Sequence, residues 1–110
     1  MNTDILILGS GPAGVQAAIY SSRRKVKTIV LGKIEDSAII HGEIENFFGI
    51  SKKIQGITLL ENSKDLALDF GVEFIEEDAV EIDKKDASFV VKLESGKEIF
   101  AKAIIIATGV

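Results

Sequence analysis

Short apolar runs alternate with longer mixed segments along the first part of the chain. The apolar runs do not alternate with polar residues, which is typical of strands buried on both faces of a parallel sheet. They lie at Asp4–Leu8, Thr28–Leu31, Val72–Ile75 and Ala103–Ala107. The residues of Pro12–Arg24 and Gly56–Phe70 favour helix instead. This strand–helix–strand order predicts βαβ units and an α/β fold built on a parallel sheet with crossover helices.

The pattern changes after residue 78, where the apolar runs become partly alternating. Such runs indicate half-exposed antiparallel strands, and Ser95-Gly96 has the composition of a hairpin turn. The runs lie at Ala79–Asp83, Ser88–Glu94 and Glu98–Lys102. We therefore expect a three-stranded antiparallel meander before the last buried strand. The segment Lys33–Lys53 has no clear period, and we interpret it as a long loop with at most short turns.

Composition narrows the class of protein. The 110 residues are 46% hydrophobic and 27% charged, which is typical of one globular domain covering residues 1–110. The net charge of −4 argues against nucleic-acid partners. No apolar run is long enough for a membrane span, and no basic leader precedes the first strand, so we expect a cytoplasmic protein. The chain has no cysteine and therefore carries no dithiol pair of its own.

Three glycines stand where the first strand should meet the first helix. Gly9, Gly11 and Gly14 have the spacing G-x-G-x-x-G, in the strand-to-helix context that this motif requires. In that motif the first glycine permits a tight turn, and the second lets a pyrophosphate approach the backbone. The third lets the helix pack closely on the strand. The motif predicts dinucleotide binding, with the phosphates at the start of the helix.

The acidic residue that usually binds the ribose in such a fold is displaced in this sequence. It is expected at the end of the second strand, but Gly32 stands there. Glu35 and Asp36 follow a few residues later, and we favour Glu35 as the ribose ligand over Asp36. The alternative is that both are solvated loop residues.

Taken together, the motifs resemble one family, the thioredoxin reductases and their relatives, in the FAD-binding portion. The resemblance rests on "ILGSGPAGVQAAIY" (7–20), "EIENFFG" (43–49), "FGVEF" (70–74) and "AKAIIIATG" (101–109), in the order of the family. It implies a Rossmann-like FAD/NAD(P)-binding domain in which the meander is an insertion before the last strand.

The resemblance also implies a set of FAD contacts. The pyrophosphate would lie on Gly9, Ser10, Gly11, Pro12, Ala13 and Gly14. Glu35 would bind the adenosine ribose, Asn46 would contact the cofactor near the ribityl chain, and Ala79 would meet the adenine through its backbone. Ala107, Thr108 and Gly109 would pass close to the pyrophosphate. No catalytic residue and no metal ligand is implied for this chain.

Two departures from the family pattern affect the expected function. The family has Gly-Gly-Gln against the flavin end of the cofactor, whereas this chain has Ser37, Ala38 and Ile39, and Ile39 cannot supply the hydrogen bonds of the amide. The NAD(P)H domain with its Cys-x-x-Cys pair, and the returning segment that completes the FAD domain, have no counterpart in these 110 residues. We therefore expect a homo-oligomer or a second polypeptide to complete the flavin site.

Three functional hypotheses remain from the sequence. The first is an FAD-binding module of a thioredoxin-reductase-like flavin oxidoreductase, which needs another chain or domain to receive electrons from NAD(P)H and is no disulfide reductase by itself. The second is a stand-alone, non-catalytic dinucleotide-binding or regulatory protein. The third is a fragment of a longer reductase.

The aromatic residues yield a further set of expectations. We interpret Tyr20 as core packing, and at least one of Phe47 and Phe48 as an exposed lid or partner contact in a glycine-flanked loop. The other aromatic residues fall in periodic elements and are predicted to lie in the core; they are Phe70, Phe74, Phe89 and Phe100.

Overall fold

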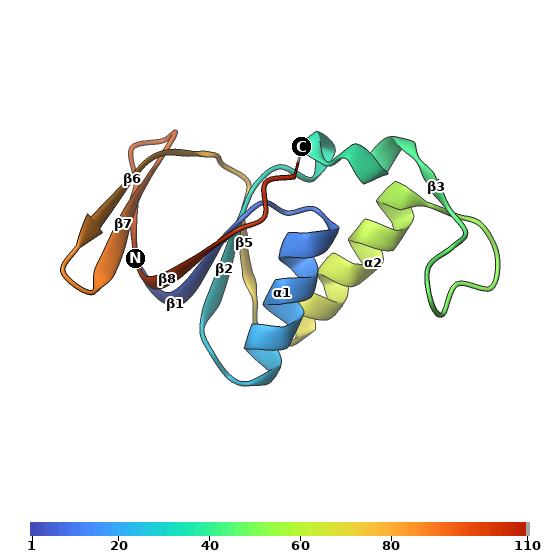
Figure 1. Ribbon diagram of the computed structural model, residues 1–110, viewed down its shortest axis with the longest axis horizontal. Helices are drawn as coiled ribbons and strands as arrows, with labels where there is room; N and C mark the ends of the chain where they lie inside the picture. The colour runs from blue at the N-terminus through green and yellow to red at the C-terminus, as the bar shows by residue number, and fades with distance from the viewer. Residues whose placement is uncertain (110) are drawn as a thin grey trace.

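The computed structural model describes residues 1–109, which form a six-stranded mixed sheet, a small two-stranded sheet and two α-helices (Figure 1). The strands of the large sheet follow the order β5-β2-β1-β8-β7-β6. Their bounds are β1 Asn2–Leu8, β2 Thr28–Leu31, β5 Glu73–Ile75, β6 Ala79–Lys85, β7 Ser88–Leu93 and β8 Glu98–Ile106. The helices are α1 Pro12–Arg23 and α2 Gly56–Asp69. Neither helix is long and apolar enough to cross a membrane.

The parallel half of the sheet confirms the predicted arrangement of strands and crossover helices. β1 lies between β2 and β8 and runs parallel to both, so that Ile7 pairs with Val30 on one side and Ile105 on the other. β5 continues the parallel sheet beyond β2. The carboxyl ends of β1, β2, β5 and β8 therefore meet at one edge, which is where ligands bind in open α/β sheets.

Both helices cover the same face of this sheet, as Figure 1 shows. Pro12 occupies the first turn of α1, where its missing N–H costs nothing. The helix buries Val15, Ala18 and Ile19 against the sheet. α2 adds Leu60 and Ala67 to the same core and ends before Gly71, which has a φ of 92°.

The meander folds over the opposite face of the sheet. β6, β7 and the first half of β8 form it as predicted, and Gly96, with a φ of 91°, makes the hairpin turn. Val91 and Leu93 of β7 pack against Leu6 and Leu31 of the parallel strands. The sheet therefore has one core under the helices and a second core under the meander.

One prediction about β8 is wrong. We expected Glu98–Lys102 and Ala103–Ala107 to be separate strands, but residues 98–106 form one continuous strand. Its first half pairs with β7 as far as Ala101, and its second half pairs only with β1. Because β7 ends its pairing there, the second half of β8 is an edge, and Ile106 is 72% exposed instead of buried.

The segment Lys33–Lys53 is more ordered than the sequence indicated. It contains two short 3₁₀ helices, Ile34–Asp36 (η1) and Ala38–His41 (η2), followed by β3, Glu43–Ile44. β3 pairs antiparallel with β4, Ile54–Gln55, which leads directly into α2. Strands of two residues carry no recognisable pattern, so this pairing escapes sequence analysis.

Several aromatic side chains are less buried than expected. Tyr20, Phe70 and Phe100 are exposed, although each lies in a helix, at a helix end or in a strand. Phe74 does pack against the core under the helices. Phe48 is almost fully exposed, which confirms the predicted exposure in the Phe47–Phe48 pair, while its role as a lid or partner contact stays a prediction.

Candidate functional site

The turn between β1 and α1 brings three backbone segments into direct contact. Gly9 has a φ of 118°, and a Cβ at this position would overlap the carbonyl oxygen of Ala107. A Cβ on Gly14 would in turn overlap the carbonyl oxygen of Gly9. The N–H of Gly9 donates to Leu31 at 2.8 Å, and the N–H of Ala107 donates to Leu8 at 2.8 Å. The turn is therefore joined to the ends of both strands that flank β1.

Gly11 differs from the other two glycines of the motif. Its φ of −78° is open to any residue, and a Cβ there would meet only the side chain of Ser37, with the Oγ 3.1 Å away. Neither the backbone conformation nor the core requires glycine at this position. Gly11 lines a cavity, however, and its hydrogen leaves the backbone accessible from that side.

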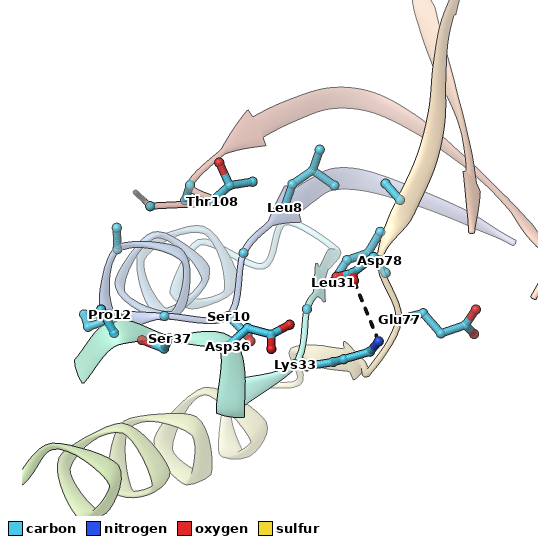
Figure 2. Close-up of a pocket in the computed structure, with 18 of the residues that line it drawn as sticks. Leu8, Ser10, Pro12, Leu31, Lys33, Asp36, Ser37, Glu77, Asp78 and Thr108 are labelled. Atoms are coloured by element: carbon cyan, nitrogen blue, oxygen red, sulfur yellow. Dashed lines mark ion pairs between the residues drawn. The ribbon is translucent and has the colours of Figure 1, made fainter. Parts of the chain in front are cut away.

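The cavity lies at the carboxyl ends of the parallel strands and has a volume of about 800 Å³ (Figure 2). The β1–α1 turn, the end of β2 with η1 and η2, the connection from β5 to β6, and the end of β8 contribute to its walls. Nine of the twelve residues proposed from the sequence line it; they are Gly9, Ser10, Gly11, Pro12, Ala13, Ala79, Ala107, Thr108 and Gly109.

The other three residues proposed from the sequence do not line the cavity. Gly14 lies behind the wall, where it packs against Gly9. Glu35 lies in η1 outside the lining, whereas its neighbour Asp36 is part of it. Asn46 follows β3 and is also outside the lining. Ile39, which stands where the family has glutamine, lines the cavity wall.

The start of α1 gives the cavity an electropositive wall. Gly11 is the N-cap, and the first turn of α1 contains no acidic residue that would neutralise the helix dipole. The free N–H groups at a helix N-terminus and its partial positive charge together favour a bound anion. This wall suits phosphate groups.

Ser10 supplies a further polar group in the cavity wall. It is 8% exposed, and its Oγ is the one buried side-chain oxygen without a hydrogen-bond partner among residues 1–109. A buried hydroxyl without a partner costs free energy, and a hydrogen bond to a bound ligand would offset that cost. Gly32, with a φ of 144°, makes room for this serine, because a Cβ there would stand 2.9 Å from the Ser10 nitrogen.

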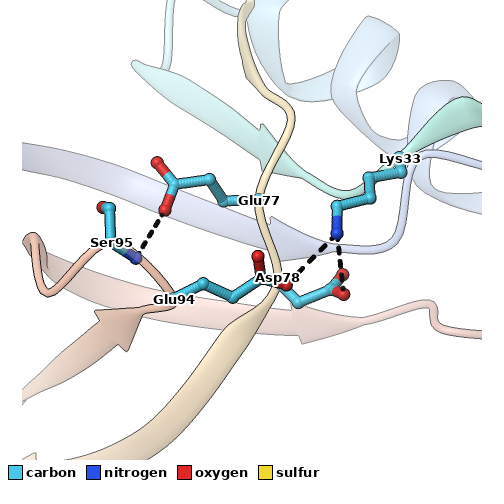
Figure 3. Close-up of polar contacts among 5 residues, drawn as sticks. All are labelled: Lys33, Glu77, Asp78, Glu94 and Ser95. Atoms are coloured by element: carbon cyan, nitrogen blue, oxygen red, sulfur yellow. Dashed lines mark hydrogen bonds and ion pairs between the residues drawn. The ribbon is translucent and has the colours of Figure 1, made fainter.

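Beyond the end of β2, the cavity-lining residues Lys33, Glu77 and Asp78 make polar contacts with Glu94 and Ser95 of the meander (Figure 3). The Nζ of Lys33 lies 3.3 Å from Oε1 of Glu94 and 3.7 Å from Oδ2 of Asp78. The hydrogen bond to Glu94, followed by the charges of Glu94 and Asp78, raises the pKa of Lys33. The Oε1 of Glu77 accepts a hydrogen bond from the Ser95 N–H at 2.9 Å, and contact with Ser95 lowers the pKa of Glu77.

Sequence analysis did not single out these charged residues as parts of the site. Lys33 follows β2, Glu77 and Asp78 follow β5, and Glu94 follows β7, so they come from three separate parts of the chain. For Lys33, Glu77 and Asp78 the available signal was their position, because residues that follow parallel strands meet at the same edge of the sheet. Glu94 follows the antiparallel strand β7, and this rule does not reach it.

The fold and the cavity together define a Rossmann-like dinucleotide-binding domain. The family model of the pyridine nucleotide-disulphide oxidoreductases matches residues 3–110, and the chain belongs to this family. Within it, the chain matches the N-terminal, FAD-binding portion of thioredoxin reductases.

Individual relatives agree with this assignment. The chain is 37% identical over 108 residues to the thioredoxin reductase of Peptoclostridium acidaminophilum, a match that covers 96% of this chain and 34% of the relative. A thioredoxin reductase structure from Gloeobacter violaceus superposes with a TM-score of 0.92 at 31% identity, covering 98% of this chain and 34% of that one. The thioredoxin reductase of Giardia duodenalis gives a TM-score of 0.89 at 35% identity, with coverage of 98% and 36%. The chain thus spans about a third of the length of these relatives.

Proposed function

We propose that this chain binds FAD through its ADP half and serves as the cofactor module of a thioredoxin-reductase-like flavin oxidoreductase. The observation that carries the proposal is the Ser10 hydroxyl, which is buried, unpartnered and part of the cavity wall. It stands beside the N-terminus of α1, whose dipole favours an anion. A diphosphate satisfies both groups at once.

Different residues of the cavity wall would contact different parts of the expected ligand. The backbone of Gly9–Ala13 and the Ser10 hydroxyl would hold the pyrophosphate, and Ala107–Gly109 would lie alongside it. Ala79 would face the adenine. The proposed roles of Glu35 in ribose binding and of Asn46 near the ribityl chain rest on the family resemblance alone. At the flavin end, the apolar side chain of Ile39 offers packing and no hydrogen bond.

The division of chemistry follows from the residues present. When bound, the flavin would supply the redox chemistry, accepting electrons from NAD(P)H and passing them on. The residues of this chain bind and orient the cofactor. The chain has no cysteine, so disulfide reduction would need a thiol from elsewhere, because exchange proceeds through a thiolate.

The exposed edge of β8 supports a second element of the proposal, a further polypeptide segment that completes the site. Residues after Ala101 pair with β1 alone, and Ile106 is largely exposed at the end of the strand beside the cavity. Unpaired strand edges and exposed apolar side chains of this kind mark interfaces. A second copy, another chain or another part of a longer reductase would cover this edge.

Titration calorimetry of the purified chain with FAD, ADP and FMN tests the proposal. FAD and ADP should bind, and FMN, which lacks the ADP half, should bind far more weakly. The bound flavin should also give the visible absorption bands of a flavoprotein after gel filtration. Binding of NAD⁺ in preference to FAD would favour the stand-alone dinucleotide-binding protein, and FMN binding with no response to ADP would contradict the proposed site.

A further inference from the structure

The position of Lys33 after β2 and the ion pairs that it makes give opposite expectations for the ligand. In Rossmann-like folds an acidic residue at this place binds the ribose 2′-OH, whereas a basic residue nearby accommodates a 2′-phosphate. This chain has Gly32 at the end of the strand and then Lys33, which lines the cavity. By position alone, Lys33 would mark a site for a 2′-phosphorylated adenosine.

The ion pairs of Lys33 argue against a site for a 2′-phosphate. Its ammonium group is shared between Asp78 and Glu94, at 3.7 and 3.3 Å, and is directed toward the meander (Figure 3). Lys33 is the one basic side chain in the cavity lining formed by residues 1–109, whereas Asp36 and Asp78 line the same cavity. The carboxylate of Glu77, also a lining residue, points away from the cavity and binds the Ser95 N–H (Figure 2). The wall around the expected ribose is therefore net negative even with the lysine protonated.

We propose that the carboxylates of Asp36 and Asp78 make this cavity selective for adenosine diphosphates whose ribose carries no 2′-phosphate, because Lys33 is held by Asp78 and Glu94. A 2′-phosphate would approach the carboxylates of Asp36 and Asp78, and like charges at close range oppose binding. Lys33 cannot offset them while its own charge is neutralised by two partners. The proposal deepens the proposed function, since it rests on the binding of an adenosine diphosphate in this cavity.

A matched pair of ligands tests the selectivity. ADP-ribose and 2′-phospho-ADP-ribose differ only in the 2′-phosphate, and their dissociation constants can be measured by calorimetry at low ionic strength, where charge effects are least screened. We expect the wild-type chain to bind ADP-ribose about tenfold more tightly or better. Equal binding of the two ligands would overturn the selectivity but leave the proposed function standing. Failure of both to bind would overturn the proposed function itself.

Removal of the two partners of Lys33 tests its role. In the double variant Asp78→Asn/Glu94→Gln the lysine is free, and we expect the preference for ADP-ribose to fall from about tenfold toward one. The matched control is Asp69→Asn/Glu61→Gln, which makes the same change in net charge on the exposed side of α2. It should keep the wild-type preference. Loss of the preference in this control would show that net charge alone sets it, and would overturn the proposal.

A triple variant separates the lysine from the general loss of negative charge. Lys33→Met in the Asp78→Asn/Glu94→Gln background removes the freed ammonium group, and the preference for ADP-ribose should return in part, because Asp36 remains. If the triple variant binds both ligands alike, the lost carboxylates explain the double variant without Lys33, and the proposal fails. The circular dichroism spectrum and the urea midpoint of each variant check that it is still folded.

Discussion

The carbonyl oxygen of Gly9 lies where the β-carbon of any other residue at position 14 would stand. The Gly14 contact explains how closely α1 packs against the β1–α1 turn. An alanine at position 14 would push the first turn of α1 away from β1, because the atom in its way belongs to the backbone and not to a flexible side chain.

We therefore expect Gly14→Ala to lower the free energy of unfolding by about 1–3 kcal/mol, the usual range for overpacking. The urea midpoint measures this change. Gly42→Ala is the matched control, because a Cβ there would stand 3.5 Å from the Ile39 carbonyl oxygen, an ordinary contact. Equal stability of the two variants would contradict the close packing of Gly9 and Gly14.

A substitution of Gly11, unlike one of Gly14, should affect ligand binding more than stability. In Gly11→Val the new Cβ would meet only the movable side chain of Ser37, and the valine would stand in the cavity lining where the pyrophosphate is proposed to lie. We expect a loss of about 1 kcal/mol in stability, since valine is a poor N-cap, and a loss of measurable FAD and ADP binding. Unchanged affinity by calorimetry would remove residues 9–14 from the site.

Ser10→Ala should change stability and affinity in opposite directions. The substitution removes a buried hydroxyl that has no partner, so the ligand-free protein should gain up to about 1 kcal/mol. FAD affinity should fall about fivefold or more, because a hydrogen bond to the pyrophosphate is lost.

Ser21→Ala provides the control for Ser10→Ala. Its hydroxyl lies 2.6 Å from the hydroxyl of Thr28, far along α1 from the cavity. This variant should lose about 1 kcal/mol of stability and keep its FAD affinity. A Ser10→Ala variant that loses stability without losing affinity would assign the hydroxyl a purely structural role.

The domain should lose stability at low pH because the carboxylate of Glu77 becomes protonated. Contact with Ser95 holds the pKa of Glu77 below its ordinary 4.5, so the folded state favours the ionised carboxylate. This stabilisation is present above pH 4.5 and is lost as the pH falls through the lower, folded-state pKa. Urea midpoints between pH 7 and 3 should fall less steeply for Glu77→Gln than for the wild type. Parallel curves would show that the contact with Ser95 has no effect on stability.

The edge of β8 should drive self-association of the isolated chain. Ile106 is largely exposed where the strand has no second neighbour, so we expect concentration-dependent oligomers in sedimentation experiments. Ile106→Lys should weaken this association, because edge lysines oppose strand addition. Leu68→Lys, a change on the exposed side of α2, should leave it intact. A wild-type chain that stays monomeric while holding FAD tightly would contradict the need for a completing segment.

The elements that could be predicted from the sequence are those with strong local signals. β1, α1 and β2 begin and end within two residues of their predicted bounds, because buried apolar runs, Pro12 and the glycines act over a few residues. The division of β8 was wrong because Lys102 interrupts the apolar pattern where the strand changes partners. The pairing of β3 with β4 depends on only two residue pairs and left no pattern to read.

In the site, too, contiguous motifs could be predicted from the sequence, whereas contacts between residues far apart in the sequence could not. The glycine motif located the β1–α1 turn, since the motif is contiguous in the sequence. The choice between Glu35 and Asp36 depends on the turn of η1, which directs one of two neighbouring acids to the cavity wall. The contact of Lys33 with Glu94 joins residues 61 positions apart, and no local pattern signals it.

The pairing of β1 with β8 also has a consequence for how the chain acquires its structure. Asn2 pairs with Phe100 and Leu8 with Ile106, so β1 is synthesised about a hundred residues before the strand that pairs with it. Contacts between residues so distant in sequence slow folding, because the chain must close a long loop before they form. At about 5–20 residues per second on the ribosome, β1 remains without its second neighbour for seconds. Until β8 emerges, no strand pairs with that edge of β1, which carries Leu6 and Ile7, two residues fully buried in the finished domain.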